Sequence, residues 1–332
     1  MVIPDKLRER IFTVSEADFE DLAMNIFRYQ ATVNPVYRRY IELLGRHPDD
    51  IGSLRDIPFL PVNLFRGHEV ICTPKRAEVV FESSTTTGQH PSRHHVPDVD
   101  LYRESCLRSF GQFVGQPSQF VILALLPSYL ERGHSSLVYM VQTIMESGSQ
   151  PESAFYKDDL EAVASALQQM EANGQPCLLI GVTYALLDLA ERFPFALSTT
   201  MVMETGGMKG RREELVRAEV HDRLKTAFSI AQVWSEYGMT ELLSQAYSVK
   251  DGLFQTPSWM QVRMRDVTDP FAEVPDGRVG AINIIDLANL YTCSFIATDD
   301  IGKWHTDRQA FEVLGRLDAA EIRGCSLLYP GL

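Results

Sequence analysis

The sequence contains one run of hydroxyl-bearing side chains that is suited to binding phosphate groups. The run is 83–88, Ser-Ser-Thr-Thr-Thr-Gly, and Arg93 follows it. Hydroxyl and backbone N–H groups can surround phosphate oxygens, the glycine lets the backbone approach closely, and the arginine adds a fixed positive charge. The run is not a Walker A loop, because the pattern G-x-x-x-x-G-K-[ST] does not occur in the chain. Taken alone, it is as consistent with a polar surface loop as with a phosphate-binding loop.

Three further stretches combine glycine with charged or hydroxylated residues, and they follow in a definite order. They are Tyr-Gly-Met-Thr-Glu at 237–241, Ala-Thr-Asp-Asp-Ile-Gly at 297–302 and Gly-Arg-Leu-Asp at 315–318. With the run at 83–88, their order resembles the adenylate-forming superfamily of acyl-CoA ligases, peptide-synthetase adenylation domains and luciferase relatives. Four motifs in the same order are a much more specific signal than any one of them.

Within that superfamily, the chain looks similar to the acyl-protein synthetases of the LuxE type. These proteins belong to the bacterial fatty-acid reductase that supplies aldehyde for bioluminescence. The similarity rests on residues 27–40, on 126–130 and on the ending 323–328. Two positions depart from the superfamily pattern, because Thr85 and Asp299 stand where glycine is usual.

The resemblance implies that the chain uses ATP and Mg²⁺ to activate a carboxylic acid as an acyl-adenylate, with release of pyrophosphate. It implies that Glu241 binds Mg²⁺, for which carboxylate oxygen is suited, and that Thr240 contacts the α-phosphate. It further implies that Tyr237 lies against adenine, that Asp300 accepts hydrogen bonds from the ribose, and that Arg316 holds the ribose or a phosphate. The resemblance also implies that one set of residues contacts the β- and γ-phosphates, namely Ser83, Ser84, Thr85, Thr86, Thr87 and Gly88. It implies that Gly206 and Gly207 border the adenine, and that Gly238 and Met239 border the acyl group.

The end of the sequence predicts where the activated acyl group goes. Acyl-CoA ligases carry a further C-terminal domain with a catalytic lysine near its end, whereas the last lysine here is Lys303. We therefore expect the mobile C-terminal domain to be absent or truncated, with an adenylate-forming domain at 1–315 and a hinge remnant and tail at 316–332. In acyl-protein synthetases a cysteine near the end takes the acyl group, and Cys325 stands at the matching place. A thiolate that attacks an acyl-adenylate gives a reactive thioester, which a partner such as an acyl reductase or an acyl carrier can accept.

Two other functions stay open from the sequence. A CoA ligase of the phenylacetate type would form a CoA thioester without using Cys325. A degenerate nucleotide- or acyl-binding subunit of a larger complex is favoured by Thr85 and by the missing C-terminal domain. The presence of Glu241, Asp300 and Arg316 argues against that second alternative.

The composition limits the partners and the compartment. The 332 residues are 45% hydrophobic and 23% charged, which is ordinary for a globular chain with a large core and roughly two domains. The net charge is −13 without a concentrated basic run, which argues against nucleic acid or an anionic membrane as the main partner. Five cysteines without a C-x-x-C pair indicate reduced thiols. With no apolar run near the ~20 residues of a membrane span and no signal sequence, a cytoplasmic enzyme is expected.

Alternating apolar runs and helical patterns predict the elements that position these residues. The expected strands are 77–81, 120–126, 176–182 and 198–204, and the expected helices between and before them are 16–45, 101–113, 136–147 and 158–173. The fold class is therefore α/β, a large domain with mostly parallel sheets flanked by helices. From about residue 250, short runs such as 280–285 predict antiparallel strands and a smaller β subdomain.

Local signals refine this outline. Asn34 and Pro35 mark a helix start, Thr183 is expected to cap the helix after 176–182, and residues 91–97 are expected to form a turn. His94 and His95 lie near the phosphate-loop candidate and are expected to be solvated loop residues. Because ligands bind at the carboxyl ends of parallel strands, the stretches after the strands are expected to converge on one crevice.

Overall fold

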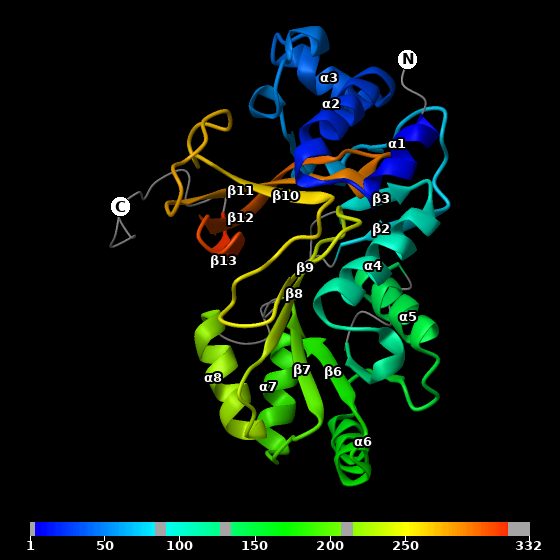
Figure 1. Cartoon of the computed structure of the whole chain (residues 1–332), viewed down its shortest axis with the longest axis vertical. Coiled ribbons are helices and arrows are strands. Elements are labelled where there is room, and N and C mark those ends of the chain that lie inside the picture. Colours follow the sequence, from blue (N-terminus) through cyan, green and yellow to red (C-terminus); the bar gives the residue numbers. More distant parts are fainter. Residues whose placement is uncertain (1–3, 84–90, 127–133, 207–214, 318–332) are drawn as a thin grey trace.

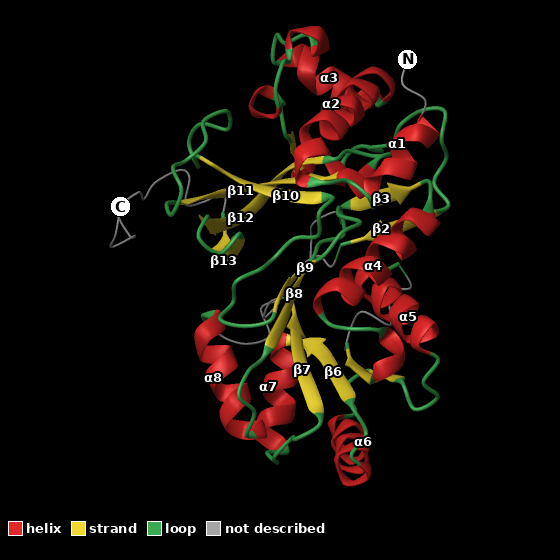
Figure 2. Ribbon diagram, viewed as in Figure 1, coloured by secondary structure: helices red, strands yellow, loops and turns green. Residues whose placement is uncertain are grey.

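The structure is a computed structural model that describes residues 4–83, 91–126, 134–206 and 215–317 (Figure 1). Some predicted site residues lie outside this part of the chain, namely Ser84, Thr85, Thr86, Thr87, Gly88, Gly207 and Cys325. The described residues form a six-stranded sheet, a five-stranded sheet and a two-stranded hairpin, with helices packed around them (Figure 2). None of the helices in these ranges is long and apolar enough to span a bilayer.

The six-stranded sheet is the parallel sheet that the apolar runs predict. Its order is β5 (Ala154–Tyr156), β4 (Val121–Leu125), β6 (Cys177–Val182), β7 (Thr200–Thr205), β8 (Trp234–Tyr237) and β9 (Ala246–Ser248). All neighbours are parallel except β9, which runs antiparallel to β8. Every residue of β4 and β6 is buried, as expected for strands covered on both faces. The helices around this sheet are α4 (Val99–Phe113), α5 (Ser136–Gly148), α6 (Leu160–Asn173), α7 (Thr183–Arg192) and α8 (Arg217–Phe228).

The five-stranded sheet confirms the antiparallel region predicted after residue 250. Its order is β1 (Leu60–Pro61), β12 (Phe295–His305), β11 (Val279–Asp286) and β10 (Met260–Arg265), with β13 (Ala310–Arg316) also paired to β12. The short β1 is its one parallel member among the described strands, and it comes from the N-terminal part of the chain.

The N-terminal helices cover this C-terminal sheet rather than the parallel sheet. They are α1 (Pro4–Ile11), α2 (Glu16–Val33) and α3 (Pro35–Leu43), which Figure 1 shows beside β10 to β12. Phe27 on α2 packs edge-on against Phe295 on β12 with ring centroids 6.0 Å apart. Asn34 caps α3 as predicted, because its side-chain oxygen accepts from the N–H groups of Val36 and Tyr37.

The hairpin corrects one local prediction. Residues 93–96 form strand β3 (Arg93–Val96), which pairs antiparallel with β2 (Val79–Glu82), so the expected turn over 91–97 was wrong. The reason is burial, because Phe81 and Val96 turn into the core while β3 completes the backbone hydrogen bonds of β2. The two strands flank the predicted phosphate loop.

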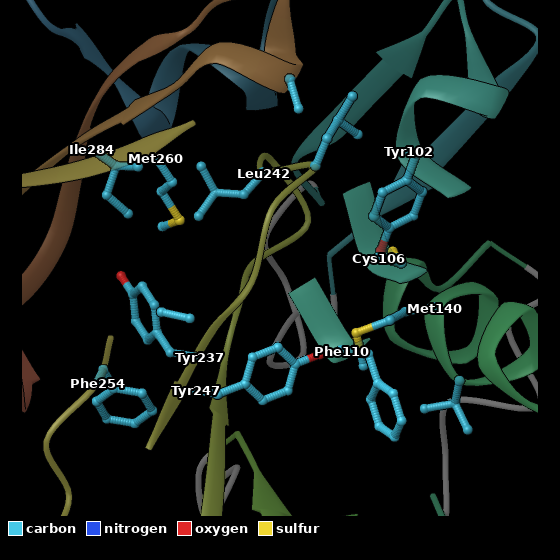
Figure 3. Close-up of a cluster of buried hydrophobic side chains, with 14 of the residues drawn as sticks. Tyr102, Cys106, Phe110, Met140, Tyr237, Leu242, Tyr247, Phe254, Met260 and Ile284 are labelled. Carbon is cyan, nitrogen blue, oxygen red and sulfur yellow. The ribbon is translucent and has the colours of Figure 1, made fainter. Parts of the chain in front are cut away.

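Short 3₁₀ turns complete the described elements, and one continuous core joins the layers. The turns are η1 (Pro48–Asp50), η2 (Leu54–Asp56), η3 (Val62–Arg66), η4 (Pro117–Gln119) and η5 (Leu287–Asn289). Figure 3 shows the core passing from Ile284 and Met260 on the antiparallel sheet, through Leu242 and Tyr247, to Phe110 on α4. The antiparallel sheet and the parallel sheet therefore share packed side chains at the place where the predicted site residues gather.

Candidate active site

Three of the predicted nucleotide-binding residues form one connected group between the two large sheets. The Tyr237 hydroxyl, at the end of β8, donates to Asp300 Oδ2 on β12 over 2.8 Å. Arg316 lies opposite Asp300 across β12 and β13, with its Nε 3.4 Å from Asp300 Oδ1. The Arg316 side chain is 64% exposed, so its guanidinium can take a further anionic partner. Residues that are 79 positions apart in the sequence, from 237 to 316, thus meet at one place.

Asp300 is a largely buried carboxyl group whose charged form would be stabilised by further hydrogen-bond donors. Burial raises the pKa of the Asp300 carboxyl, while the charge of Arg316 and the hydrogen bond from Tyr237 act in the opposite direction. The Tyr237 ring packs against Phe254 and Phe311, with centroids 5.8 and 5.5 Å away, as Figure 3 shows for Phe254. The aromatic packing fixes the ring, so the hydroxyl is held on the carboxylate.

Glu241 and Thr240 lie in the turn after β8, close to the same group. Glu241 is only 5% exposed, and burial raises the pKa of its carboxyl, with a hydrogen bond from Ser92 opposing that rise. The charges of Arg316 and Asp300 also act on the Glu241 carboxyl, so the three side chains share one electrostatic environment. Ser92 N donates to Ser83 Oγ over 2.9 Å, which links the start of the predicted phosphate loop to the residue before β3, beside Glu241.

His94 corrects a prediction, since it is fully buried and not a solvated loop residue. Its Nδ1 lies 2.8 Å from the carbonyl oxygen of Thr240, and its Nε2 lies 3.1 Å from Thr292 Oγ1. Burial lowers the pKa of His94 to about 4, so the ring is neutral near pH 7. A carbonyl oxygen only accepts hydrogen bonds, so the neutral ring carries its proton on Nδ1.

Glu236 is a buried carboxyl group that the sequence reasoning missed. It stands directly before Tyr237 on β8, and its Oε2 accepts a hydrogen bond from the Thr205 hydroxyl on β7. Burial, together with the nearby charge of Glu204, raises the pKa of Glu236 to about 7. A Cβ atom at Gly238 would lie 2.5 Å from Glu236 Oε1, so this carboxyl lies directly over the Tyr-Gly turn. The signal that could have revealed it was an acidic residue in the strand-like stretch 233–237, directly before the Tyr-Gly-Met-Thr-Glu motif.

Gly206, predicted at the adenine edge, directly follows β7 and lies beside a second buried carboxyl. Its φ of +69° is in the left-handed region that favours glycine, and its carbonyl accepts a hydrogen bond from the Thr183 hydroxyl. The same Thr183 hydroxyl lies 3.1 Å from Glu204 Oε2 as an alternative acceptor, and α7 begins at Thr183 without a side-chain cap. The expectation that Thr183 caps this helix was therefore wrong, because its hydroxyl joins the ends of β6 and β7 instead.

Arg217 connects the two large sheets beside this corner. Its Nε donates to Glu204 Oε1 over 3.1 Å, its Nη1 donates to the carbonyl of Val313 on β13, and its guanidinium lies over the Phe254 ring. Burial alone would raise the pKa of Glu204, but the hydrogen bond with His221 and the charge of Arg217 lower it below its ordinary value. Glu204 is thus a charged structural group, in contrast to Glu236 on the adjacent strand.

The described residues could bind a metal ion only together with coordinating atoms from a bound ligand. Within the described ranges, no three or more His, Cys, Asp or Glu side chains gather to hold a metal ion. Glu241 offers one buried carboxylate, whose ionised form a cation would stabilise. A Mg²⁺ ion at Glu241 would therefore take its other ligands from phosphate oxygens and water, an arrangement that suits Mg²⁺.

The cysteines in the described part of the chain do not provide a nucleophile. Cys72, Cys106, Cys177 and Cys293 are all buried, and burial raises the pKa of each thiol. A raised pKa suppresses the reactive thiolate, so these residues act in packing.

Comparison with known proteins places this chain in a family. The family described as "Acyl-protein synthetase, LuxE" matches residues 12–330, and a search of curated proteins finds no match. Among solved structures, 2-hydroxyisobutyryl-CoA ligase in complex with 2-HIB-AMP and CoA is 18% identical with a TM-score of 0.67, covering 96% of this chain and 73% of the ligase. The ATP-bound RpMatB-BxBclM chimera B3 is 18% identical with a TM-score of 0.53, covering 71% of this chain and 47% of the chimera. Apo MatB from Rhodopseudomonas palustris is 18% identical with a TM-score of 0.52, covering 85% of this chain and 58% of MatB.

These matches differ in what they establish. The solved structures share the fold, and this chain spans about half of the length of the chimera. The family match extends over nearly the whole sequence and includes all four motifs. The chain therefore belongs to the LuxE family of acyl-protein synthetases and has the fold of adenylate-forming ligases.

Proposed function

We propose that this chain uses ATP and Mg²⁺ to activate a carboxylic acid, most simply a fatty acid, as an acyl-adenylate. We further propose that the acyl group then moves to Cys325 and on to a protein partner. The observation that carries the proposal is the meeting of Tyr237, Asp300 and Arg316 beside the buried carboxyl of Glu241. Family membership supports the acyl-protein chemistry. Two solved structures with the same fold contain ATP and 2-HIB-AMP, respectively, which supports the choice of nucleotide.

The nucleotide would lie across the ends of β7 and β8. Asp300 keeps unused lone pairs beside the bonds to Tyr237 and Arg316, so it can accept from ribose hydroxyls. The exposed Arg316 guanidinium can then hold the ribose or a phosphate. Gly206 and Gly207 would border the adenine beside the ring of Tyr237.

The phosphates would lie between the predicted loop and the turn after β8. Ser83 through Gly88 would supply hydroxyl and N–H donors to the β- and γ-phosphates, and Thr240 would contact the α-phosphate. Glu241 would hold Mg²⁺, which neutralises phosphate charge as pyrophosphate leaves. Gly238 and Met239 would border the acyl group.

The second step would take place at Cys325, in the tail 316–332 that we propose follows the adenylate-forming domain 1–315. The Cys325 thiolate attacks the acyl carbonyl carbon, the bond between that carbon and the AMP oxygen breaks, and AMP leaves with the electron pair. The thioester product can pass its acyl group to an acyl reductase or an acyl carrier. The proposed compartment is the cytoplasm, on the ground of the reduced thiols that the cysteine pattern indicates.

The test of the acyl-protein step is incorporation of radiolabelled tetradecanoate with ATP and Mg²⁺, followed on a denaturing gel. We expect label on the wild-type chain that hydroxylamine removes, no label on Cys325→Ser, and normal label on the neighbouring control Ser326→Ala. Equal labelling of Cys325→Ser would show that Cys325 is not the acceptor. CoA-thioester formation by that variant would favour a CoA ligase of the phenylacetate type.

Pyrophosphate release across a panel of acids tests the adenylation step separately. Release by wild type but not by Glu241→Gln is the expected result. Absence of release from wild type with every acid would favour the degenerate nucleotide- or acyl-binding subunit instead.

A further inference from the structure

Two buried side chains from different elements hold successive backbone carbonyl groups in the turn after β8. His94 Nδ1 on β3 lies 2.8 Å from the carbonyl oxygen of Thr240. Asn289 Nδ2 in η5 donates to the carbonyl oxygen of Glu241 over 2.9 Å. His94 and Asn289 are both 0% exposed, so water does not compete for either bond.

These two contacts fix the direction of the Glu241 side chain. Each carbonyl belongs to a planar peptide unit, so holding the oxygen orients the whole unit. The Cα atom of Glu241 joins the unit that contains the Thr240 carbonyl to the unit that contains its own carbonyl. Fixing both units therefore fixes the direction in which the Glu241 Cβ atom leaves the backbone.

The two donors belong to one buried network that is anchored on α2. Thr292 Oγ1 lies 3.1 Å from His94 Nε2 and 3.3 Å from the carbonyl oxygen of Asn289. Gln30 donates to that same Asn289 carbonyl over 2.9 Å, and Asn34 donates to the Thr292 carbonyl over 2.8 Å. The turn after β8 is thus held from the hairpin on one side and from the N-terminal helices on the other.

The Asn289 side chain also makes an unfavourable contribution to folding that a purely structural residue would avoid. In the described part of the structure, its Oδ1 atom is buried and has no hydrogen-bond partner. An unpartnered buried amide oxygen is unfavourable for folding. The side chain is therefore used for its donor, which faces the Glu241 carbonyl.

We propose that His94 and Asn289 are positioning residues that hold the Thr240–Glu241 turn in the orientation that binds Mg²⁺ and the phosphates of ATP. This inference rests on the proposed function, since it assigns the support of the same site. Neither side chain needs to touch the nucleotide, because both act through the backbone of the turn.

The variants separate the donor at each position from the bulk of the side chain. His94→Asn keeps an N–H donor near the place of Nδ1, whereas His94→Leu removes it. Asn289→Leu removes the second donor at similar volume. The matched control is Thr200→Val at the opposite end of β7, which loses a partly buried 2.6 Å hydrogen bond from its hydroxyl to Glu171 Oε1.

The measurements are the dissociation constant for MgATP by isothermal titration, the Mg²⁺ concentration that gives half-maximal pyrophosphate release, and the thermal midpoint. Each lost donor is worth about fivefold to tenfold in a binding constant. We expect His94→Leu and Asn289→Leu to weaken MgATP binding by about that factor and to raise the Mg²⁺ requirement. His94→Asn should stay within about twofold of wild type, and Thr200→Val should lower the thermal midpoint without changing MgATP binding.

The outcomes distinguish this inference from the proposed function. Wild-type MgATP binding by folded His94→Leu and Asn289→Leu would overturn the inference alone. Loss of binding in His94→Asn as large as in His94→Leu would overturn the role of the Nδ1 donor. If His94→Leu does not fold, Thr292→Val removes the hydroxyl that faces Nε2 and should weaken binding by about threefold, and no weakening would count against the network. A wild-type chain that binds no MgATP would refute the proposed function and this inference together.

Discussion

Replacing Glu236 by glutamine is expected to change how the stability of the chain depends on pH. The carboxyl is buried between β7 and β8, accepts a hydrogen bond from Thr205, and has a pKa raised from the ordinary 4.5 to about 7 by burial and by the charge of Glu204. The folded chain therefore keeps a proton on Glu236 at pH values where the unfolded chain has lost it. The contribution of Glu236 to the free energy of unfolding is fully present below pH 4.5 and is lost as the pH rises through about 7.

The size of this loss follows from the two pKa values. The difference between 4.5 and about 7 corresponds to about 3 kcal/mol at about 1.4 kcal/mol for each pH unit. About 2 kcal/mol of this loss occurs between pH 5.5 and 8.5. Glutamine cannot ionise, so Glu236→Gln should gain about 2 kcal/mol relative to wild type over that range. Other titrating groups, such as His94, are present in both chains and cancel in the difference.

Urea unfolding followed by tryptophan fluorescence measures this difference, and Trp234 on β8 reports from the same strand. With a urea slope of about 3 kcal/mol per molar, the difference between the two midpoints should change by about 0.7 M from pH 5.5 to 8.5. The control is Glu161→Gln, whose side chain is 75% exposed and which should show no such change. Midpoints of Glu236→Gln and wild type that move in parallel with pH would refute a raised pKa for Glu236.

Three other substitutions test the packing around the site. Asp286→Asn should lower the free energy of unfolding by about 2 kcal/mol in urea titrations. The fully buried Asp286 carboxylate accepts from three N–H groups and one hydroxyl, and an amide would turn a donor toward them. Arg217→Ala should lower the free energy of unfolding by about 2 kcal/mol, because it leaves Glu204 without its cation. Adding Glu204→Gln should recover part of that loss. A double variant that is no more stable than Arg217→Ala would argue against the ion pair. Gly238→Ala should lower the free energy of unfolding by about 1–3 kcal/mol. In a Glu236→Ala background at least half of this loss should disappear, because the 2.5 Å contact between the new Cβ atom and Glu236 Oε1 is then removed. Equal losses in both backgrounds would contradict the contact.

The parts of the fold that depend on local pattern were predictable from the sequence. The predicted strands 120–126, 176–182 and 198–204 became β4, β6 and β7. The glycine after the predicted helix 158–173 has the left-handed φ of +63° that ends α6. Asn34 before Pro35 predicted the start of α3, because capping involves only neighbouring residues. The family motifs predicted the meeting of Tyr237, Asp300 and Arg316, since the resemblance carries spatial information that spacing alone lacks.

The parts that depend on distant partners were not predictable in this way. Residues 93–96 have two adjacent histidines, and only pairing with β2 and burial of His94 against the turn after β8 make them a strand. The packing of α2 on the C-terminal sheet depends on contacts such as those from Gln30 to η5, across more than 250 residues. The burial of Glu236 depends on its position next to β7, where Thr205 donates to its carboxyl, and the sequence of its own strand does not show this.

Transfer of ¹⁸O from tetradecanoate to AMP tests the central claim most directly. The acid, labelled with ¹⁸O in its carboxyl group, is incubated with the chain, ATP and Mg²⁺, and the AMP is analysed by mass spectrometry. If the site forms an acyl-adenylate that is then cleaved at the acyl carbon, the AMP carries one ¹⁸O atom, and Glu241→Gln forms about 100-fold less of it. Formation of ADP, or of AMP without ¹⁸O, would contradict the account.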